Sequence, residues 1–198
     1  MGVLSTPSAT LRSRRRLLAQ AFGIGLALTG LGRPGAVRAG TADAEVQIKS
    51  AFLYKFLTFI EWPSQVFDQP TAALTIGVLG ADRLGDELSQ LAAGRQAGGR
   101  PITVRRLRAG EALTGLHVLF IGRPESNRTA AAVAAAKGQP MLVVTESDQA
   151  FAMGSAINFV VVDDKVRFDV ALQPAEQVGL KISARLLSVA RKVVTNAS

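Results

Sequence analysis

The sequence predicts an α/β protein, specifically a three-layer α/β/α sandwich with a mixed, mainly parallel sheet and a late antiparallel hairpin. Two observations lead to this class. Three short, continuous apolar runs, typical of strands buried on both faces, are separated by helical or long connecting segments. Later in the chain, the runs Ala156–Val162 and Val166–Leu172 flank the turn sequence Asp163–Lys165, which predicts a hairpin.

The N-terminal segment has the order of a secretory signal peptide. The basic stretch Arg12–Arg16 precedes the apolar run Leu17–Leu31, and small residues follow at Val37 and Ala39. We therefore expect residues 1–39 to be removed by cleavage near Ala39, which would place the mature protein in the periplasm.

The same segment leaves the export route open, because Ser13–Leu18 also resembles a twin-arginine motif. The alternative is an uncleaved membrane anchor, although an apolar run of about fifteen residues is short for a transmembrane helix. Residues 40–198 contain no repeat and no linker, so we expect them to form a single domain.

The charge and cysteine content exclude several functions. Six of the 23 Lys and Arg residues precede Gly40, but none of the 15 Asp and Glu residues does, so the remainder has a net charge near +2. That balance does not predict nucleic-acid binding. The chain has no cysteine, so it forms no disulfide and carries out no thiol chemistry.

The first predicted element of the mature chain is a helix that begins at the N-cap Asp43 and ends near Trp62, because Pro63 follows. Its apolar residues cover about 220° of arc, roughly twice what a surface helix needs. The helix therefore packs against two surfaces, and the second belongs either to this chain or to another. Tyr54, Glu61 and Trp62 are the candidate partner-interface residues, since Trp and Tyr often anchor interfaces.

The remaining elements follow in order between loops rich in Gly and Pro. The sequence predicts strands at Leu74–Gly80, Pro101–Arg108, Leu116–Gly122 and Pro140–Thr145, and helices at Asp82–Ala93, Ser126–Lys137 and Pro174–Val194. Gly138 ends the second of these helices. Pro174 suits the first turn of the last, where its missing N–H is not needed.

A candidate ligand crevice lies at the ends of the predicted strands. In open α/β sheets, ligands bind beyond the carboxyl ends of the strands. Those ends carry Gly80, Asp82, Gly122, Arg123 and Glu146. They predict a small-molecule crevice that contains an arginine, or else the glycines only turn the chain.

The inventory of catalytic residues is small. His117 is the only histidine and lies in an apolar run, where a core or strand-end role is expected. One histidine and no cysteine argue against an ordinary zinc site. The chain also has no serine-hydrolase, phosphate-loop or metalloprotease motif. We therefore predict no enzymatic activity, no metal and no cofactor.

Two segments carry a family resemblance, Ala51–Pro63 (AFLYKFLTFIEWP) and Val178–Val193 (VGLKISARLLSVARKV). With LHVLFIG and PMLVVTES between them, they resemble the YfiR family of periplasmic proteins over Val46–Val194. The resemblance implies an α/β sandwich that forms a homodimer. It also implies a regulator that binds the periplasmic domain of an inner-membrane diguanylate cyclase of the YfiN type and lowers cyclic di-GMP. An outer-membrane lipoprotein is the implied partner that relieves this inhibition.

The chain departs from the family pattern at a few positions. Leu116 stands where members often have a cysteine, so redox control is not carried over. Gly154–Ser155 replaces paired glycines, and Ala171 replaces a frequent asparagine. The alternative function is a periplasmic small-molecule-binding sensor module that serves a kinase or a transporter through the strand-end crevice.

Overall fold

The computed structural model describes residues 35–123, 126–147 and 149–195. Most of the predicted signal peptide lies outside these ranges, so its cleavage stays a prediction. Residues 34–198 form one compact unit.

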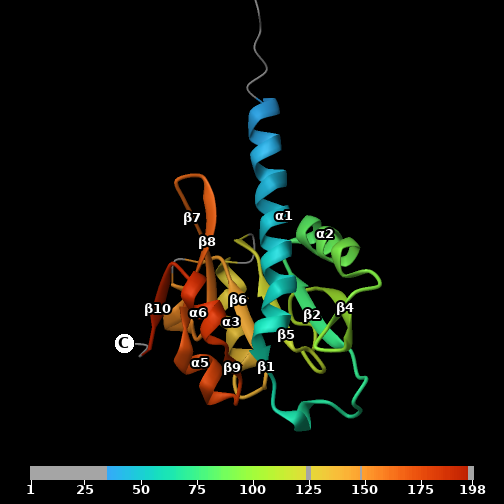
Figure 1. Cartoon of the computed structure of the whole chain (residues 1–198). Coiled ribbons are helices and arrows are strands. Elements are labelled where there is room, and N and C mark those ends of the chain that lie inside the picture. Colours follow the sequence, from blue (N-terminus) through green and yellow to red (C-terminus); the bar gives the residue numbers. More distant parts are fainter. Residues whose placement is uncertain (1–34, 124–125, 148, 196–198) are drawn as a thin grey trace, which may run out of the picture. The chain divides into compact units, whose positions relative to one another are not determined.

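A mixed, mostly parallel sheet forms the middle layer and confirms the predicted fold class (Figure 1). The strand order is β10-β8-β7-β6-β5-β2-β4-β3. Strands β4, β2, β5, β6 and β7 are parallel, whereas β8 pairs antiparallel with β7. The strands are β2 (Leu74–Leu79), β3 (Gln96–Ala97), β4 (Arg100–Leu107), β5 (Val118–Ile121), β6 (Leu142–Thr145), β7 (Ile157–Val162), β8 (Lys165–Ala171) and β10 (Lys192–Val194).

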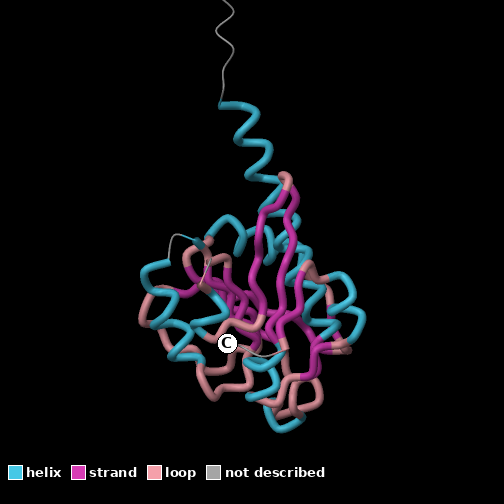
Figure 2. The backbone as a smooth tube through the Cα atoms, turned by 90° about the vertical axis from the view of Figure 1, so that its left-hand side faces the viewer, coloured by secondary structure: helices cyan, strands magenta, loops and turns pink. Residues whose placement is uncertain are grey.

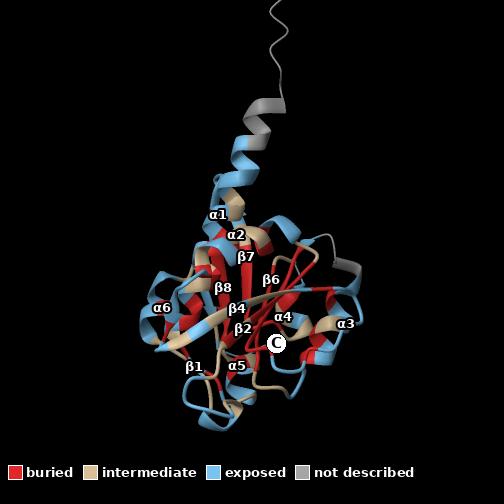
Figure 3. Ribbon diagram, turned by 90° about the vertical axis from the view of Figure 1, so that its right-hand side faces the viewer, coloured by how far each residue is buried: buried red, intermediate tan, exposed pale blue. Residues whose placement is uncertain are grey.

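Helices cover both faces of this sheet. The helices are α1 (Gly35–Phe59), α2 (Asp82–Ala92), α3 (Ser126–Ala136), α4 (Ala150–Met153), α5 (Leu172–Gln177) and α6 (Ala184–Val189). The larger core joins α1 and α2 to alternate strand residues such as Ile76, Val144 and Phe168. The other face carries a smaller core with α3, which includes Leu119, Val133 and neighbours. Side chains of continuous apolar strands therefore serve both layers, and the central strands β5 and β6 are buried along their whole length (Figure 3).

The first helix differs from its predicted limits at both ends. It begins at Gly35, so Asp43 is inside the helix and is not its N-cap. Residues 40–44 are exposed, and Asp43 pairs there with Arg83 of α2. At the other end α1 stops at Phe59, and Ile60–Glu61 forms strand β1.

The predicted last helix, Pro174–Val194, is wrong. The chain instead forms α5, strand β9 (Lys181–Ile182), α6 and β10. Gly179 breaks the helix because it takes a positive φ of 77°. Strand β9 then pairs with β1, with Ile182 opposite Ile60. The apolar residues between Val178 and Val193 are spaced as in a helix, but they lie in several short elements that pack against the rest of the fold.

The predicted hairpin is confirmed. Strands β7 and β8 pair from Ile157 with Val170 to Val162 with Lys165. Asp163 and Asp164 both have positive φ, as the tight two-residue turn between twisted strands requires.

Candidate functional site

The structure brings four of the five predicted crevice residues together at the ends of β2, β5 and β6. A Cβ atom on Gly122 would lie 2.8 Å from the carbonyl oxygen of Gly80, so the two glycines touch. The backbone N–H of Arg123 donates to the Glu146 carboxylate at 3.1 Å. Asp82, the fifth residue, begins α2 and lines a surface depression together with Gly80, Arg106 and Arg108.

Side chains from α1 fill the space that these strand ends enclose. The amine of Lys49 is buried and donates to both Glu45 and Glu146. The guanidinium of Arg123 lies 3.4 Å from Glu45 and 3.6 Å from Glu146. Two cations and two carboxylates thus form a neutral cluster, which we call the Lys49 cluster.

The Lys49 cluster changes the interpretation of the crevice. The Lys49 and Glu146 side chains are only 5% and 8% exposed, so a buried charge on each is neutralised by the other. A small anion would have to compete with carboxylates already bound to these cations. The crevice residues therefore attach α1 to the sheet in this structure, and a ligand role for them stays a prediction.

His117 is a strand-end residue, as expected. It immediately precedes β5, and its Nδ1 accepts a hydrogen bond of 3.1 Å from the backbone N–H of Thr75. Burial lowers the pKa of His117, and the positive charge of Arg100 lowers it further. In the neutral ring the proton is then on Nε2 and the Nδ1 lone pair already accepts from Thr75, so no free basic nitrogen is left for general-base catalysis.

An aromatic stack surrounds this histidine. The Phe67 ring lies 5.0 Å from the His117 ring and nearly parallel to it. Arg100 caps the other side of Phe67, with its guanidinium carbon 3.5 Å from the ring centre. Trp62 meets His117 edge-on, and its indole N–H donates to the His117 carbonyl oxygen at 3.2 Å. This stack holds the loop that follows α1 against the sheet.

The three predicted interface residues contact different parts of the fold. Trp62 is half-buried against His117, and half-buried Tyr54 donates a hydrogen bond of 3.4 Å to the Gln96 carbonyl oxygen. Glu61 is exposed in β1 opposite Lys181. Sequence reasoning thus found one freely exposed residue and two that also pack within the protein.

Sequence reasoning missed a more exposed apolar surface at the β7–β8 hairpin. Strand β6 reaches β7 only at Ile157 and Asn158, and β10 reaches β8 only at residues 169–171. Beyond these positions the hairpin continues as a two-stranded ribbon that protrudes past the other strands (Figure 2). Val161 and Val162 near its tip are 41% and 38% exposed.

Helix α1 extends this surface. Phe52 of α1 packs against Phe159 of β7, with ring centres 6.1 Å apart. Ile48, one turn before Phe52 on α1, is 42% exposed. Val161, two residues after Phe159 on β7, is 41% exposed. Each residue is on the same side of its element as the phenylalanine that packs across the helix–hairpin contact. Figure 1 shows α1 running beside the hairpin. We call Ile48 and Val161 the hairpin–helix surface, and the exposed Val162 points to the opposite face of the ribbon. Its signal in the sequence was the run of three valines next to the Asp-Asp turn.

Other kinds of site find no support among the described residues. No group of three or more His, Cys, Asp and Glu side chains there is placed to hold a metal ion. In the same part of the chain, no helix is both long and apolar enough to span a bilayer.

Comparison with known proteins now decides the family. A family model described as YfiR/HmsC-like matches residues 46–191. The chain belongs to the YfiR/HmsC-like family. This is a family of periplasmic regulators in cyclic di-GMP signalling, and its known role is regulatory.

Among solved structures, this YfiR/HmsC-like chain is similar to a crystal structure of a conserved domain protein from Vibrio cholerae O1 biovar El Tor. The TM-score is 0.53 at 13% sequence identity, with 75% of this chain covered, so the likeness concerns the fold. The aligned region spans 60% of the other chain. No curated protein matches the sequence.

Proposed function

We propose that the mature chain is a periplasmic inhibitor. It binds the periplasmic domain of an inner-membrane diguanylate cyclase of the YfiN type and lowers cyclic di-GMP. The observation that carries this proposal is the family match over residues 46–191, which spans nearly all of the domain. The basic nitrogen of His117 already accepts a hydrogen bond from Thr75, which also favours a binding role over catalysis.

The hairpin–helix surface is the contact region that we propose for the cyclase. Val161 is about 40% exposed on a ribbon whose outer part has no neighbouring strand in the described sheet, and Ile48 is similarly exposed on the adjacent α1. Burying them under a partner removes apolar area from water. Glu61, with Tyr54 and Trp62, remains a second proposed contact region.

Two further partners belong to the same proposal. A second copy of the chain would form a homodimer, and an outer-membrane lipoprotein would compete for the inhibitor and so release the cyclase. Light scattering on the purified mature protein measures the first, and co-purification with a membrane fraction measures the second. Export itself is tested by N-terminal sequencing of periplasmic protein, which should begin at Gly40.

Deletion of the gene tests the function directly. We expect intracellular cyclic di-GMP and biofilm to rise in the deletion strain and to fall again when the wild-type gene is restored. Val161→Asp should fold, because the residue is exposed, but should fail to restore the low level. Val161→Thr, which keeps the branched shape, is the matched control.

The second contact region has its own variant. Glu61→Lys reverses an exposed charge without removing a buried group, so loss of repression with normal folding would assign contact to this region. If deletion leaves cyclic di-GMP unchanged while the cyclase is expressed, the inhibitor proposal fails. That result would favour the alternative, a small-molecule sensor that serves a kinase or a transporter.

A further inference from the structure

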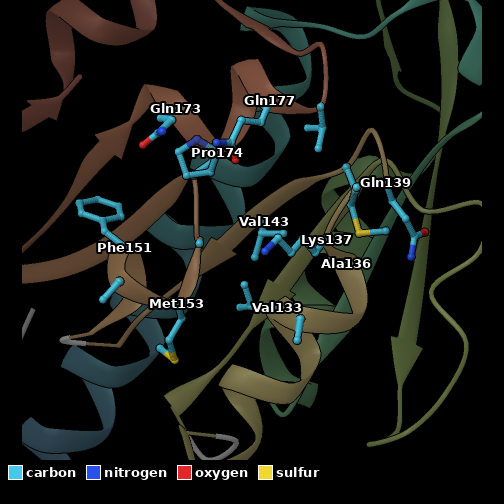
Figure 4. Close-up of a pocket in the computed structure, with 17 residues that line it drawn as sticks. Val133, Ala136, Lys137, Gln139, Val143, Phe151, Met153, Gln173, Pro174 and Gln177 are labelled. Atoms are coloured by element: carbon cyan, nitrogen blue, oxygen red, sulfur yellow. The ribbon is translucent and has the colours of Figure 1, made fainter. Parts of the chain in front are cut away.

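A cavity of about 540 Å³ lies between α3, α4 and α5 (Figure 4). Its floor includes Val143, which belongs to the smaller core on the sheet face that α1 does not cover. The cavity is therefore separate from both the Lys49 cluster and the hairpin–helix surface. The volume falls within the range of about 300–1,000 Å³ that small-molecule sites occupy.

The sequence explains why this space is open. Helix α3 is mostly alanine, and methyl groups such as those of Ala134 and Ala136 are too short to fill the gap to α5. Helix α4 has only four residues and ends at Gly154, which takes a positive φ of 103°. Small side chains on α3 and the short helix α4 therefore leave space above this face of the sheet.

The lining has an apolar body and a polar rim. Eleven of the lining residues have apolar side chains, and the larger ones are Val133, Met141, Val143, Phe151, Met153 and Val178. The polar side chains are three glutamines and Lys137 (Figure 4). The lining contains no Asp or Glu, so its only formal charge is positive.

Lys137 is available for a ligand. It is exposed at the end of α3, and within the described part of the chain no carboxylate lies in ion-pair distance of its amine. Gln139, by contrast, already donates to the Ala135 carbonyl oxygen. An unpaired ammonium beside an apolar cavity complements a molecule with an apolar body and one negative charge.

We infer that this cavity binds a small amphipathic carboxylate, with the apolar body between α3, α4 and α5 and the carboxylate at Lys137. This site goes beyond the proposed inhibitor function and does not depend on it. The flexible Met141 and Met153 side chains allow the cavity to adapt to chains of different length.

The test is a titration of the ¹⁵N-labelled mature protein with octanoate, followed by amide chemical shifts. We expect saturable shifts at residues of α3, α4 and α5, including the amides of Gly138 and Gly154. Octanol, which has the same chain without the charge, should shift the same amides with about tenfold weaker affinity.

Two variants localise the site, and both alter exposed positions, so folding should be retained. Lys137→Gln should weaken octanoate binding by about tenfold and leave octanol binding unchanged. Ala152→Trp should fill the cavity and abolish the shifts from both probes. Lys55→Gln, an exposed lysine on α1, is the control and should bind octanoate like wild type.

The inference is overturned if neither probe produces saturable shifts at α3, α4 and α5. It is equally overturned if octanoate binds Lys137→Gln as tightly as wild type, or if Ala152→Trp still binds. Cyclic di-GMP levels play no part in this test, so its failure and the failure of the inhibitor proposal are distinguishable.

Discussion

Lys49 of α1 forms a buried ion pair with Glu146 at the end of β6, 97 positions later in the chain. This pair joins helix α1 to the carboxyl end of the parallel sheet. Glu45 and Arg123 complete a neutral set of charges around it. The strand-end position that often holds a ligand in open α/β sheets is therefore occupied by the protein's own helix.

Removing one partner of this cluster should be costly. Lys49→Met leaves two carboxylates against the single cation of Arg123, and we expect a loss of about 3–5 kcal/mol in the free energy of unfolding. Urea denaturation measures it. In the double variant Lys49→Met/Glu146→Gln the charges balance again, so the loss should be smaller than the sum of the two single losses.

The matched control is Arg83→Met, which breaks the exposed pair between Arg83 and Asp43. Exposed pairs contribute at most about 1 kcal/mol, so this variant should be close to wild type. Equal losses for Lys49→Met and Arg83→Met would contradict the view that burial makes the Lys49 cluster important.

Gly122 should not tolerate a side chain. A Cβ atom there would lie 2.8 Å from the Gly80 carbonyl oxygen and 2.9 Å from the Ala81 Cβ, and neither backbone nor methyl can move away easily. We expect Gly122→Ala to cost about 1–3 kcal/mol by overpacking. Chemical denaturation checks this value.

Gly85 in α2 provides the comparison, because its nearest contact would be the flexible Arg106 side chain at 3.4 Å. Gly85→Ala should be neutral or stabilising by up to about 1 kcal/mol, since alanine favours a helix. A Gly85→Ala loss as large as that of Gly122→Ala would show that the strand-end contact is not special.

Stability should fall as the solution becomes acidic because of His117. Burial first, and Arg100 second, lower its pKa below the ordinary value of 6.5 in the folded state. The unfolded chain then binds the proton more readily, so the contribution is complete above pH 6.5 and is lost as pH falls toward the folded pKa.

Urea midpoints measured from about pH 7.5 to about pH 5 test this prediction. His117→Gln keeps a side chain that can accept from the Thr75 N–H but does not titrate in this range. The variant should show a shallower pH dependence than wild type. Parallel curves for the two proteins would mean that His117 does not contribute to the pH dependence of stability.

Phe56 should be far more important to folding than Glu61. Phe56 is fully buried and packs edge-on against Phe168, with ring centres 5.2 Å apart. Phe56→Ala should cost about 3–5 kcal/mol, whereas Glu61→Ala at an exposed position should stay within about 0.5 kcal/mol. Thermal and chemical unfolding of both variants decide it, and an unaffected Phe56→Ala protein would contradict the assigned core.

The local sequence was sufficient for strands β2 and β4–β8 of the sheet and for helices α1, α2 and α3. A strand such as Val118–Ile121 is buried on both faces, so each of its residues is apolar and the pattern can be recognised without a neighbour. The hairpin was likewise predictable, because the Asp163–Asp164 turn depends on local backbone conformation. The family resemblance was confirmed over residues 46–191.

Tertiary structure decided the features that depend on partners distant in sequence. Ile60 and Ile182 leave helical conformation because β1 and β9 pair with each other, and no local pattern reports that pairing. Lys49 lies among apolar residues of its helix, and only the fold places Glu146 beside it. The exposure of Val161 depends on where β6 and β10 stop. Apolar periodicity records that a residue is buried, but pairing and charge neutralisation depend on which segments meet in space.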